Sequence, residues 1–468
     1  MAFEYHQIKR NISDNYLNSL IKDLRFASMT KFKARSYTKR MFLANGVSTA
    51  EVHEILLPEL IALAGETLDG QRDPNQENFS RILSQLATED IPVRDLLHVH
   101  TVLTRLGYFC LAQKCRVLAK TSAASIYQRY GRNASDQSAL EAFYGMFEKG
   151  ELISAAKIIS ERPWMVKSVA NLLPLATILH KFGYLKSNAL TQTSIDLQRN
   201  SGPCFIDYIK GKRVALVGPG VPDKVDGAEI DDADIVVRIN CMHSVFEEDH
   251  KYQGSKTSVV YCVPKLFRKN IRSNFPRFER YDKATYIVSS EPAFSDGVSL
   301  GLFPQHLVSE SNHKDAMSVG KISSSPDNVG LFNGHLNFGP RIIFDLFKRE
   351  AAAISVYNMD FRTTAGYAAG YRPTDERDIE TSARILRDVS SNDQFSAFKF
   401  VQLFSAKGVV QGGGEFLQLM KKSDDEFYNL MERTWRTRRG NILRYEWKRR
   451  KYLSRIKRKI SSVLVRNA

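Results

Sequence analysis

Two short segments carry residues whose types and spacing suit the binding of a phosphorylated ligand. In the first, the apolar run 214–217 stops at Gly218-Pro219-Gly220, and a second apolar run ends with Arg238 and Asn240. A buried strand that meets a glycine turn brings backbone N–H groups close to a ligand. A cation beside an amide suits a phosphate and the polar edge of a nucleotide. This segment therefore predicts a nucleotide site.

The second segment is a loop that opens an apolar helix. His335, Asn337 and Gly339 lie in this loop, Pro340 stands at a favourable first-turn position, and an apolar strand follows at 354–357. Helix N-termini offer free N–H groups and positive potential to anions. Taken alone, the segment is more typical of an ordinary loop–helix–strand unit.

The elements that position these residues are strands alternating with helices between about 205 and 430. Strands are predicted over 214–217, 234–238, 257–263, 284–288 and 353–357, and helices over 374–389 and 392–407. This alternation predicts a mainly parallel sheet covered on both faces. In such sheets ligands bind at the carboxyl edge. A dinucleotide fingerprint is disfavoured because no third glycine follows Gly220, and a turn without any ligand would explain the glycines alone.

Taken over their whole length, the two segments resemble the large and small sialylmotifs of the sialyltransferases, glycosyltransferase family 29. The residues that match the large motif are Gly218, Gly220, Asp234, Arg238, Asn240 and the run Gly254-Ser255-Lys256-Thr257. In the small motif Gly339 and the strand pair Val356-Tyr357 match, whereas Asn337 stands where a small hydroxyl residue is usual. The family's Asn after the first glycine is Pro219 here.

The resemblance implies that both motifs hold the cytidine monophosphate (CMP) of an activated sugar donor. The residues so implied are Gly218, Gly220, Arg238, Asn240, Asn337 and Gly339. It also implies a sialyltransferase fold of the GT-A-like type. The family's third motif carries a histidine, but the stretch 366–373 has none, so Tyr371 and Arg372 are the candidates to replace it as phosphate ligands.

The catalytic base is the point at which the chain departs most from the family. Asn392 stands where a histidine is usual, directly before Asp393, and Asn cannot accept a proton at neutral pH. Three alternatives stay open: Asp393 is the base, His335 moves in from the small-motif loop, or the activity is lost.

Residues 1–200 are predicted to be helical, with apolar residues at helical spacing over 42–63 and 96–120. Gly107, Gly150 and Gly183 are each followed about five residues later by a small or short residue. This is how the two helices of a tetratricopeptide (TPR) hairpin meet, so we expect a degenerate TPR-like array, with a plain helical bundle as the alternative. The linker is expected at 201–203, and the glycosyltransferase domain at 205–432.

The net charge of +16 is concentrated in one segment. Residues 433–468 carry 14 Lys and Arg against the single acid Glu446, which leaves about +3 for the rest of the chain. Apolar residues that include Trp447, Ile456 and Ile460 fall near one helical face of this tail. The composition is typical of an interfacial helix on anionic lipid. The alternatives are a segment that binds nucleic acid and a solvated charged helix. We do not expect nucleic acid as the partner.

The N-terminus lacks the pattern of a signal peptide, and no run reaches the roughly 18 apolar residues of a membrane span. The five cysteines are scattered, so we expect reduced thiols. Animal sialyltransferases are anchored in the Golgi, so these features point to a bacterial relative that is cytoplasmic and peripheral at the inner membrane face.

The sequence thus predicts an inverting glycosyltransferase for surface polysaccharide, without a metal or other cofactor. It would transfer sialic acid or a similar keto acid, such as Kdo, from a CMP-activated donor to a glycan or glycolipid acceptor. The alternative is a helical-repeat scaffold with a catalytically degenerate nucleotide-binding domain.

Overall fold

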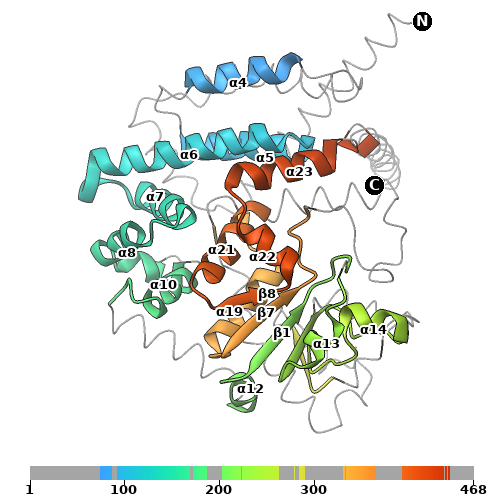
Figure 1. Cartoon of the computed structure of the whole chain (residues 1–468). Helices are drawn as coiled ribbons and strands as arrows, with labels where there is room; N and C mark the ends of the chain where they lie inside the picture. The colour runs from blue at the N-terminus through green and yellow to red at the C-terminus, as the bar shows by residue number, and fades with distance from the viewer. Residues whose placement is uncertain are drawn as a thin grey trace, which may run out of the picture. The chain divides into compact units, whose positions relative to one another are not determined.

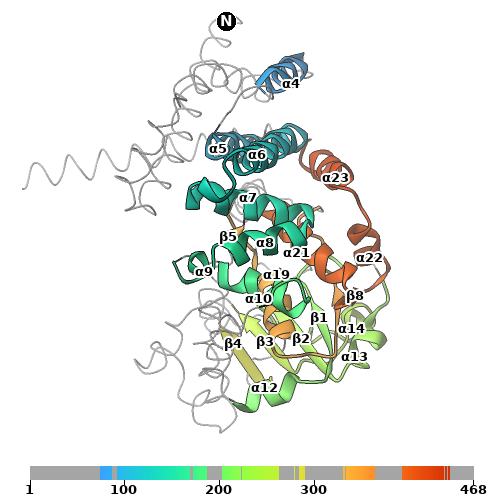
Figure 2. The ribbon, with the colours of Figure 1, turned by 90° about the vertical axis from the view of Figure 1, so that its left-hand side faces the viewer.

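The computed structural model in Figures 1 and 2 describes part of the chain. The described residues are 74–86, 92–168, 172–186, 203–222, 224–262, 279, 284–289, 330–331, 334–363, 393–436, 438–439 and 441–442. The chain forms two compact units, each built from separate stretches of sequence. Unit 1 comprises Met1–Gly131, Thr374–Ser391 and Asp424–Ala468, and unit 2 comprises Arg132–Pro373 and Asn392–Ser423.

The described part of unit 1 consists of helices. They are α4 (Pro74–Leu86), α5 (Val93–Leu106), α6 (Phe109–Tyr130) and α23 (Asp424–Arg436). Gly107 ends α5 because it takes the left-handed conformation, with φ 83°, which glycine adopts without strain. Helix α23 packs on α6, where the main-chain N–H of Cys110 donates to Glu432 Oε2 at 3.0 Å.

The beginning of the expected basic tail belongs to this packed unit. Helix α23 runs through Arg433, the expected start of the tail, and Trp435 is completely buried. Arg439 lies with its guanidinium 4.1 Å from the centre of the Tyr108 ring. The described residues at the beginning of the expected tail are 433–436, 438–439 and 441–442, and among them burial holds Trp435 and a cation–π contact holds Arg439. Trp447, Ile456 and Ile460 lie outside the described residues.

Unit 2 contains a six-stranded sheet in the order β4-β3-β2-β1-β7-β8, with every neighbouring pair parallel (Figures 1 and 2). The strands are β1 (Arg213–Val217), β2 (Ile235–Ile239), β3 (Val259–Cys262), β4 (Tyr286–Ser289), β7 (Ala353–Tyr357) and β8 (Val410–Gly412). The expected α/β class with a parallel sheet is confirmed. A small antiparallel pair, β5 (Gly330–Leu331) and β6 (Gly334–His335), lies apart from the sheet.

Each face of the sheet carries its own helices, because side chains alternate between the faces along a strand. On one face Ala215 and Val217 pack with Ile230 of α13 (Gly227–Asp231), which in turn contacts α14 (Glu247–Gln253). On the other face lies α19 (Phe338–Lys348), which contacts α21 (Gln394–Ala406). We call these the α13 face and the α19 face.

A buried polar group fixes α19 to the sheet. Tyr261 of β3 donates from its hydroxyl to Asp345 Oδ2 at 2.7 Å, and Arg349 Nε donates to the same oxygen at 2.9 Å. Burial alone would raise the pKa of Asp345, but Arg349 and Lys348 hold it below its usual value. The bonds set the position of the helix along the sheet, and therefore the position at which α19 begins.

Helices α7 (Asp136–Lys149), α8 (Leu152–Glu161), α9 (Trp164–Ser168) and α10 (Leu172–Lys181) also belong to unit 2. The ring of Phe182, just after α10, lies 5.5 Å from Phe347 of α19 and 5.6 Å from Phe404 of α21. Such aromatic pairs add about 0.5–1.5 kcal/mol each to the burial of the rings. The boundary between the two compact units falls near residue 131, within the helical part of the sequence. A domain boundary near 200 was expected.

Several expectations fall on residues without a description. The predicted helices at 42–63 and 374–389 and the first two residues of the linker lie outside the described residues. Within the described ranges, no helix is both long and apolar enough to cross a bilayer. Cys110, Cys115, Cys241 and Cys262 are free thiols.

Candidate functional site at the carboxyl edge of the sheet

The switch point of the sheet lies between β1 and β7, where the chain turns to opposite sides of the sheet. The glycine turn follows β1 at this point. Gly218 N–H donates to the carbonyl of Tyr357 at 2.8 Å, and Gly220 N–H donates to that of Asn358 at 2.9 Å. A side-chain carbon at either glycine would overlap the Asn358 carbonyl oxygen. The glycines are therefore explained by the close packing of two loops, and these two N–H groups already have protein partners.

Two asparagines stand in the left-handed conformation at this edge. Asn240 follows β2 with φ 62°, and Asn358 follows β7 with φ 53°. Asparagine tolerates this conformation better than most residues. Asn240 is buried, and its main-chain N–H donates to the Tyr261 carbonyl at 2.7 Å. The Nδ2 atom of Asn358 is buried and has no hydrogen-bond partner among the described residues.

Helix α19 begins at the same edge. A side-chain carbon at Gly339 would lie 2.6 Å from Met359 Cε and 3.7 Å from Ile239 Cδ1, which places this residue beside the ends of β7 and β2. Asn337 precedes the helix but does not cap it, since its Nδ2 donates to Gln394 Oε1 at 2.9 Å. The first turn of α19 therefore presents uncapped N–H groups and the positive end of its dipole at the edge.

Arg238 does not face this edge. Its guanidinium is buried on the α13 face and donates to the carbonyls of Gln253, Gly254 and Lys256 and to Thr257 Oγ1, at 2.7–3.2 Å. Burial lowers the pKa of Arg238 to about 10, so it stays charged at neutral pH. The structure thus places Arg238 in the support of the loop before β3, and not at the expected phosphate position.

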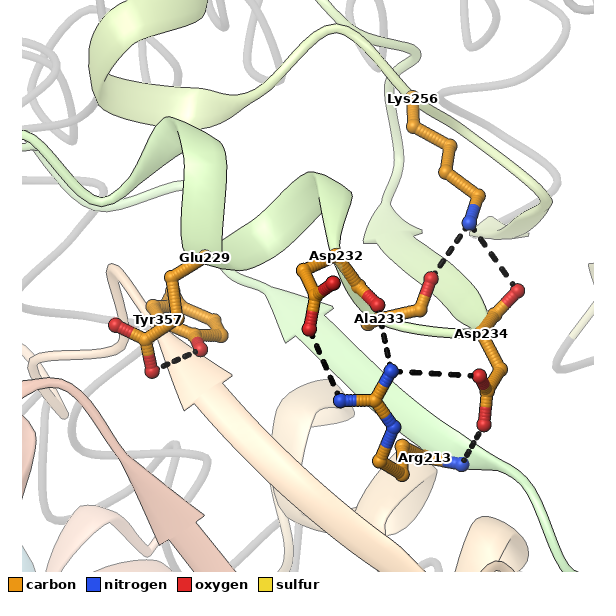
Figure 3. Close-up of polar contacts among 7 residues, drawn as sticks. All are labelled: Arg213, Glu229, Asp232, Ala233, Asp234, Lys256 and Tyr357. Atoms are coloured by element: carbon orange, nitrogen blue, oxygen red, sulfur yellow. Dashed lines mark hydrogen bonds and ion pairs between the residues drawn. The ribbon is translucent and has the colours of Figure 1, made fainter.

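Two further residues of the large motif lie at the opposite, amino edge of the sheet (Figure 3). Asp234 Oδ2 accepts from the main-chain N–H of Arg213 at 2.8 Å, and Lys256 Nζ donates to the Ala233 carbonyl at 2.5 Å. Asp232 accepts from the Arg213 guanidinium at 3.0 Å. These contacts join the starts of neighbouring strands. Asp232 and Asp234 therefore hold β1 and β2 together at this edge.

Of the two candidates for the catalytic base, the structure describes the side chain of Asp393 but not that of His335. Asp393 is buried and caps α21, since its Oδ1 accepts from Ser396 N–H at 3.1 Å and its Oδ2 accepts from the Ser396 hydroxyl at 2.6 Å. His335 is the last residue of β6, and its side chain lies outside the description, as do Tyr371 and Arg372. Asp393 therefore has a structural role as the cap of α21.

One polar pair at the carboxyl edge was missed by the sequence analysis. The hydroxyl of Tyr357, the last residue of β7, donates to Glu229 Oε1 on α13 at 2.8 Å (Figure 3). In the sequence, Tyr357 is the last residue of a predicted strand, and Glu229 is not among the residues that match the motifs. Their 128-residue separation hides the pair, and only the pairing of β7 with β1 brings them together.

The described residues contain no group of histidine, cysteine or carboxylate side chains arranged to hold a metal ion. No protein family, curated protein or solved structure matches the chain.

Proposed function

We propose that this protein is a metal-independent, inverting glycosyltransferase of the sialyltransferase type. It transfers sialic acid, or a similar keto acid such as Kdo, from a CMP-activated donor to a glycan or glycolipid acceptor in surface polysaccharide biosynthesis. The finer features of the fold belong to the same proposal: a GT-A-like sheet domain, preceded by TPR-like helical hairpins.

One observation carries the proposal: the two motif segments, about a hundred residues apart, meet at one edge of a parallel sheet. Gly339 of the small motif lies against Ile239, directly before Asn240 of the large motif. Ligands of open α/β sheets bind at this edge, beside the switch point. The uncapped start of α19 suits the phosphate of CMP. Asn240 and Asn358 supply amide groups beside it.

The charge that develops on the leaving phosphate would be stabilised mainly by the first turn of α19, since such preorganised donors supply the largest electrostatic effect in many enzymes. Arg238 contributes from a distance, as a buried positive charge behind the loop. The sequence leaves the base to Asp393 or His335. The basic tail beyond residue 442 would hold the enzyme at the anionic inner face of the membrane.

A scaffold with a degenerate nucleotide-binding domain is the second candidate, and two observations favour it. Asp393 is engaged as a helix cap, and the N–H groups of Gly218 and Gly220 are bonded to protein carbonyls. Both would be expected if the motifs had kept their structural role and lost their chemistry. The two candidates differ in whether a CMP-sugar is turned over.

A thermal-shift screen of the full chain with CMP, UDP, GDP and NAD tests the proposal. CMP alone should raise the unfolding temperature, because the proposed transferase binds a cytidine nucleotide and not the other three compounds. Asn240→Gly should remove this shift while it keeps the left-handed backbone that glycine accepts. A shift with UDP but not with CMP would refute the family assignment. Turnover of CMP-sialic acid or CMP-Kdo, unchanged by magnesium or EDTA, would separate the enzyme from the scaffold.

A further inference from the structure

The Glu229–Tyr357 pair lies beside the proposed donor site. Tyr357 is in register with Val217 of β1, and its carbonyl accepts from Gly218 N–H, the first residue of the glycine turn. Its side chain points to the α13 face, where Ile230 packs in the same apolar cluster. Glu229 stands in the first turn of α13, the helix to which the glycine turn leads. The Glu229 carboxylate therefore lies on the α13 face, next to the last residue of β7, whose carbonyl is bonded to the glycine turn.

The two groups have defined roles in their hydrogen bond. Burial raises the pKa of Tyr357, and the Glu229 carboxylate raises it further, so the phenol stays protonated and is the donor. Only Oε1 of Glu229 accepts a hydrogen bond within the described residues, which leaves Oε2 for another donor. The side chain of Glu229 is exposed. It differs in this from Asp393, which is buried with both oxygens bonded to Ser396.

The charged groups around the pair come from three directions. Asp226 and Lys224 belong to the loop before α13, and both lie against the glycine turn 412–414 after β8. Arg238 occupies the same face of the sheet, two strands from Tyr357, because both residues are in register with Val217. Helix α14 approaches α13 where Gly227 contacts the main chain of His250 and Lys251.

We propose that Glu229 is the general base of the transfer and that Tyr357 is the positioning residue that holds it; this inference rests on the proposed function. The acceptor hydroxyl gives its proton to Glu229 Oε2. Its oxygen forms the new bond to the anomeric carbon of the donor sugar. The bond from that carbon to the phosphate oxygen breaks, and CMP leaves with the electron pair.

The test compares Glu229→Gln, Tyr357→Phe and the matched control Glu248→Gln, an exposed first-turn glutamate of α14. Glu229→Gln keeps an acceptor for the Tyr357 hydroxyl but cannot take a proton. We expect it to lower kcat by about 100-fold or more, with the thermal shift by CMP unchanged. In the wild type the rate should fall as the pH is lowered, since a protonated carboxyl is no base, and this fall should be absent from the residual rate of Glu229→Gln. Tyr357→Phe should lower kcat by less and alter the pH profile, and Glu248→Gln should match the wild type.

The outcomes separate this inference from the proposed function. If the wild type shows no thermal shift with CMP, the proposed function fails and the assignment of Glu229 fails with it. If the wild type binds CMP and turns over a CMP-sugar, but Glu229→Gln keeps both the rate and the pH profile, Glu229 is a structural residue and the function stands. Binding of CMP without turnover of any CMP-keto acid would also overturn the assignment, because no proton would then be transferred.

Discussion

At the scale of single residues, the guanidinium of Arg238 is a buried cation whose partners are mainly carbonyl groups of the loop before β3. A buried charge is tolerated only when hydrogen bonds replace its water, and this loop supplies several of them. The sequence could not predict the arrangement. The partner residues lie 15–19 positions away and act mostly through their main chain, which any residue type provides.

Replacing Arg238 should therefore affect stability more than ligand binding. Arg238→Lys cannot reach all four partners, so we expect the free energy of unfolding to fall by about 3 kcal/mol or more. Urea unfolding measures this change, and the dissociation constant for CMP should change much less. The matched control is Arg213→Lys at the exposed amino edge, which should remain close to the wild type in stability. An unchanged stability of Arg238→Lys together with a lost CMP affinity would return Arg238 to the ligand site.

Asp231 gives a pH dependence with a defined sign. Burial would raise its pKa, but hydrogen bonds from the main-chain N–H groups of Ser255 and Lys256 lower it below its usual value. The stabilisation is therefore fully present above the unfolded pKa of about 3.9 and is lost as the pH falls through the lower folded value. Asp231→Asn should be less stable than the wild type at pH 7, and the difference should shrink in acid. Thermal unfolding between pH 7 and pH 3 measures it; a difference that grows in acid would contradict the assignment.

At the scale of elements, long apolar runs were predictable and short edge elements were not. β1, β2 and β7 have strong apolar patterns and were predicted, as was helix α21. β8 has only three residues, of which the last is Gly412, so its own pattern is too short to predict a strand. It is a strand only because β7 pairs with it. The contact of Gly339 with Ile239 could be expected, because a parallel sheet brings the ends of its strands to one edge. The Glu229–Tyr357 bond could not be expected, because it depends on where a single side chain of α13 lies.

The boundary of the tail can be tested by two truncations. Removal of 443–468 should leave stability and CMP binding intact and abolish binding to anionic vesicles. Removal of 433–468 should also destabilise unit 1, because it deletes the buried Trp435, whose loss alone costs about 3–5 kcal/mol. In the full chain, replacing Trp447, Ile456 and Ile460 by Ser keeps every charge and should weaken the binding that persists in high salt. If this variant bound vesicles like the wild type and also bound duplex nucleic acid tightly, the interfacial helix would be the wrong interpretation.

At the scale of the whole molecule, every described residue of the candidate site belongs to unit 2. A ligand that binds only the folded unit stabilises it by about 2.7 kcal/mol at 100 times its dissociation constant. CMP should therefore slow amide hydrogen exchange in β1, β7 and the first turn of α19, and should leave α5, α6 and α23 unchanged. Protection confined to α5 and α6 would place the nucleotide in unit 1 and contradict the site.

The interleaving of the two units has a consequence for how the chain is made. Helices α5 and α6 leave the ribosome early, whereas α23, which covers part of α6, is the last helix described. At a synthesis rate of about 5–20 residues per second, α23 is completed roughly 15–60 s after α6. The surface of α6 that α23 covers stays exposed throughout that interval, while the residues of the unit 2 sheet are being synthesised. Nascent chains stalled before residue 424 should therefore be the form most in need of a chaperone.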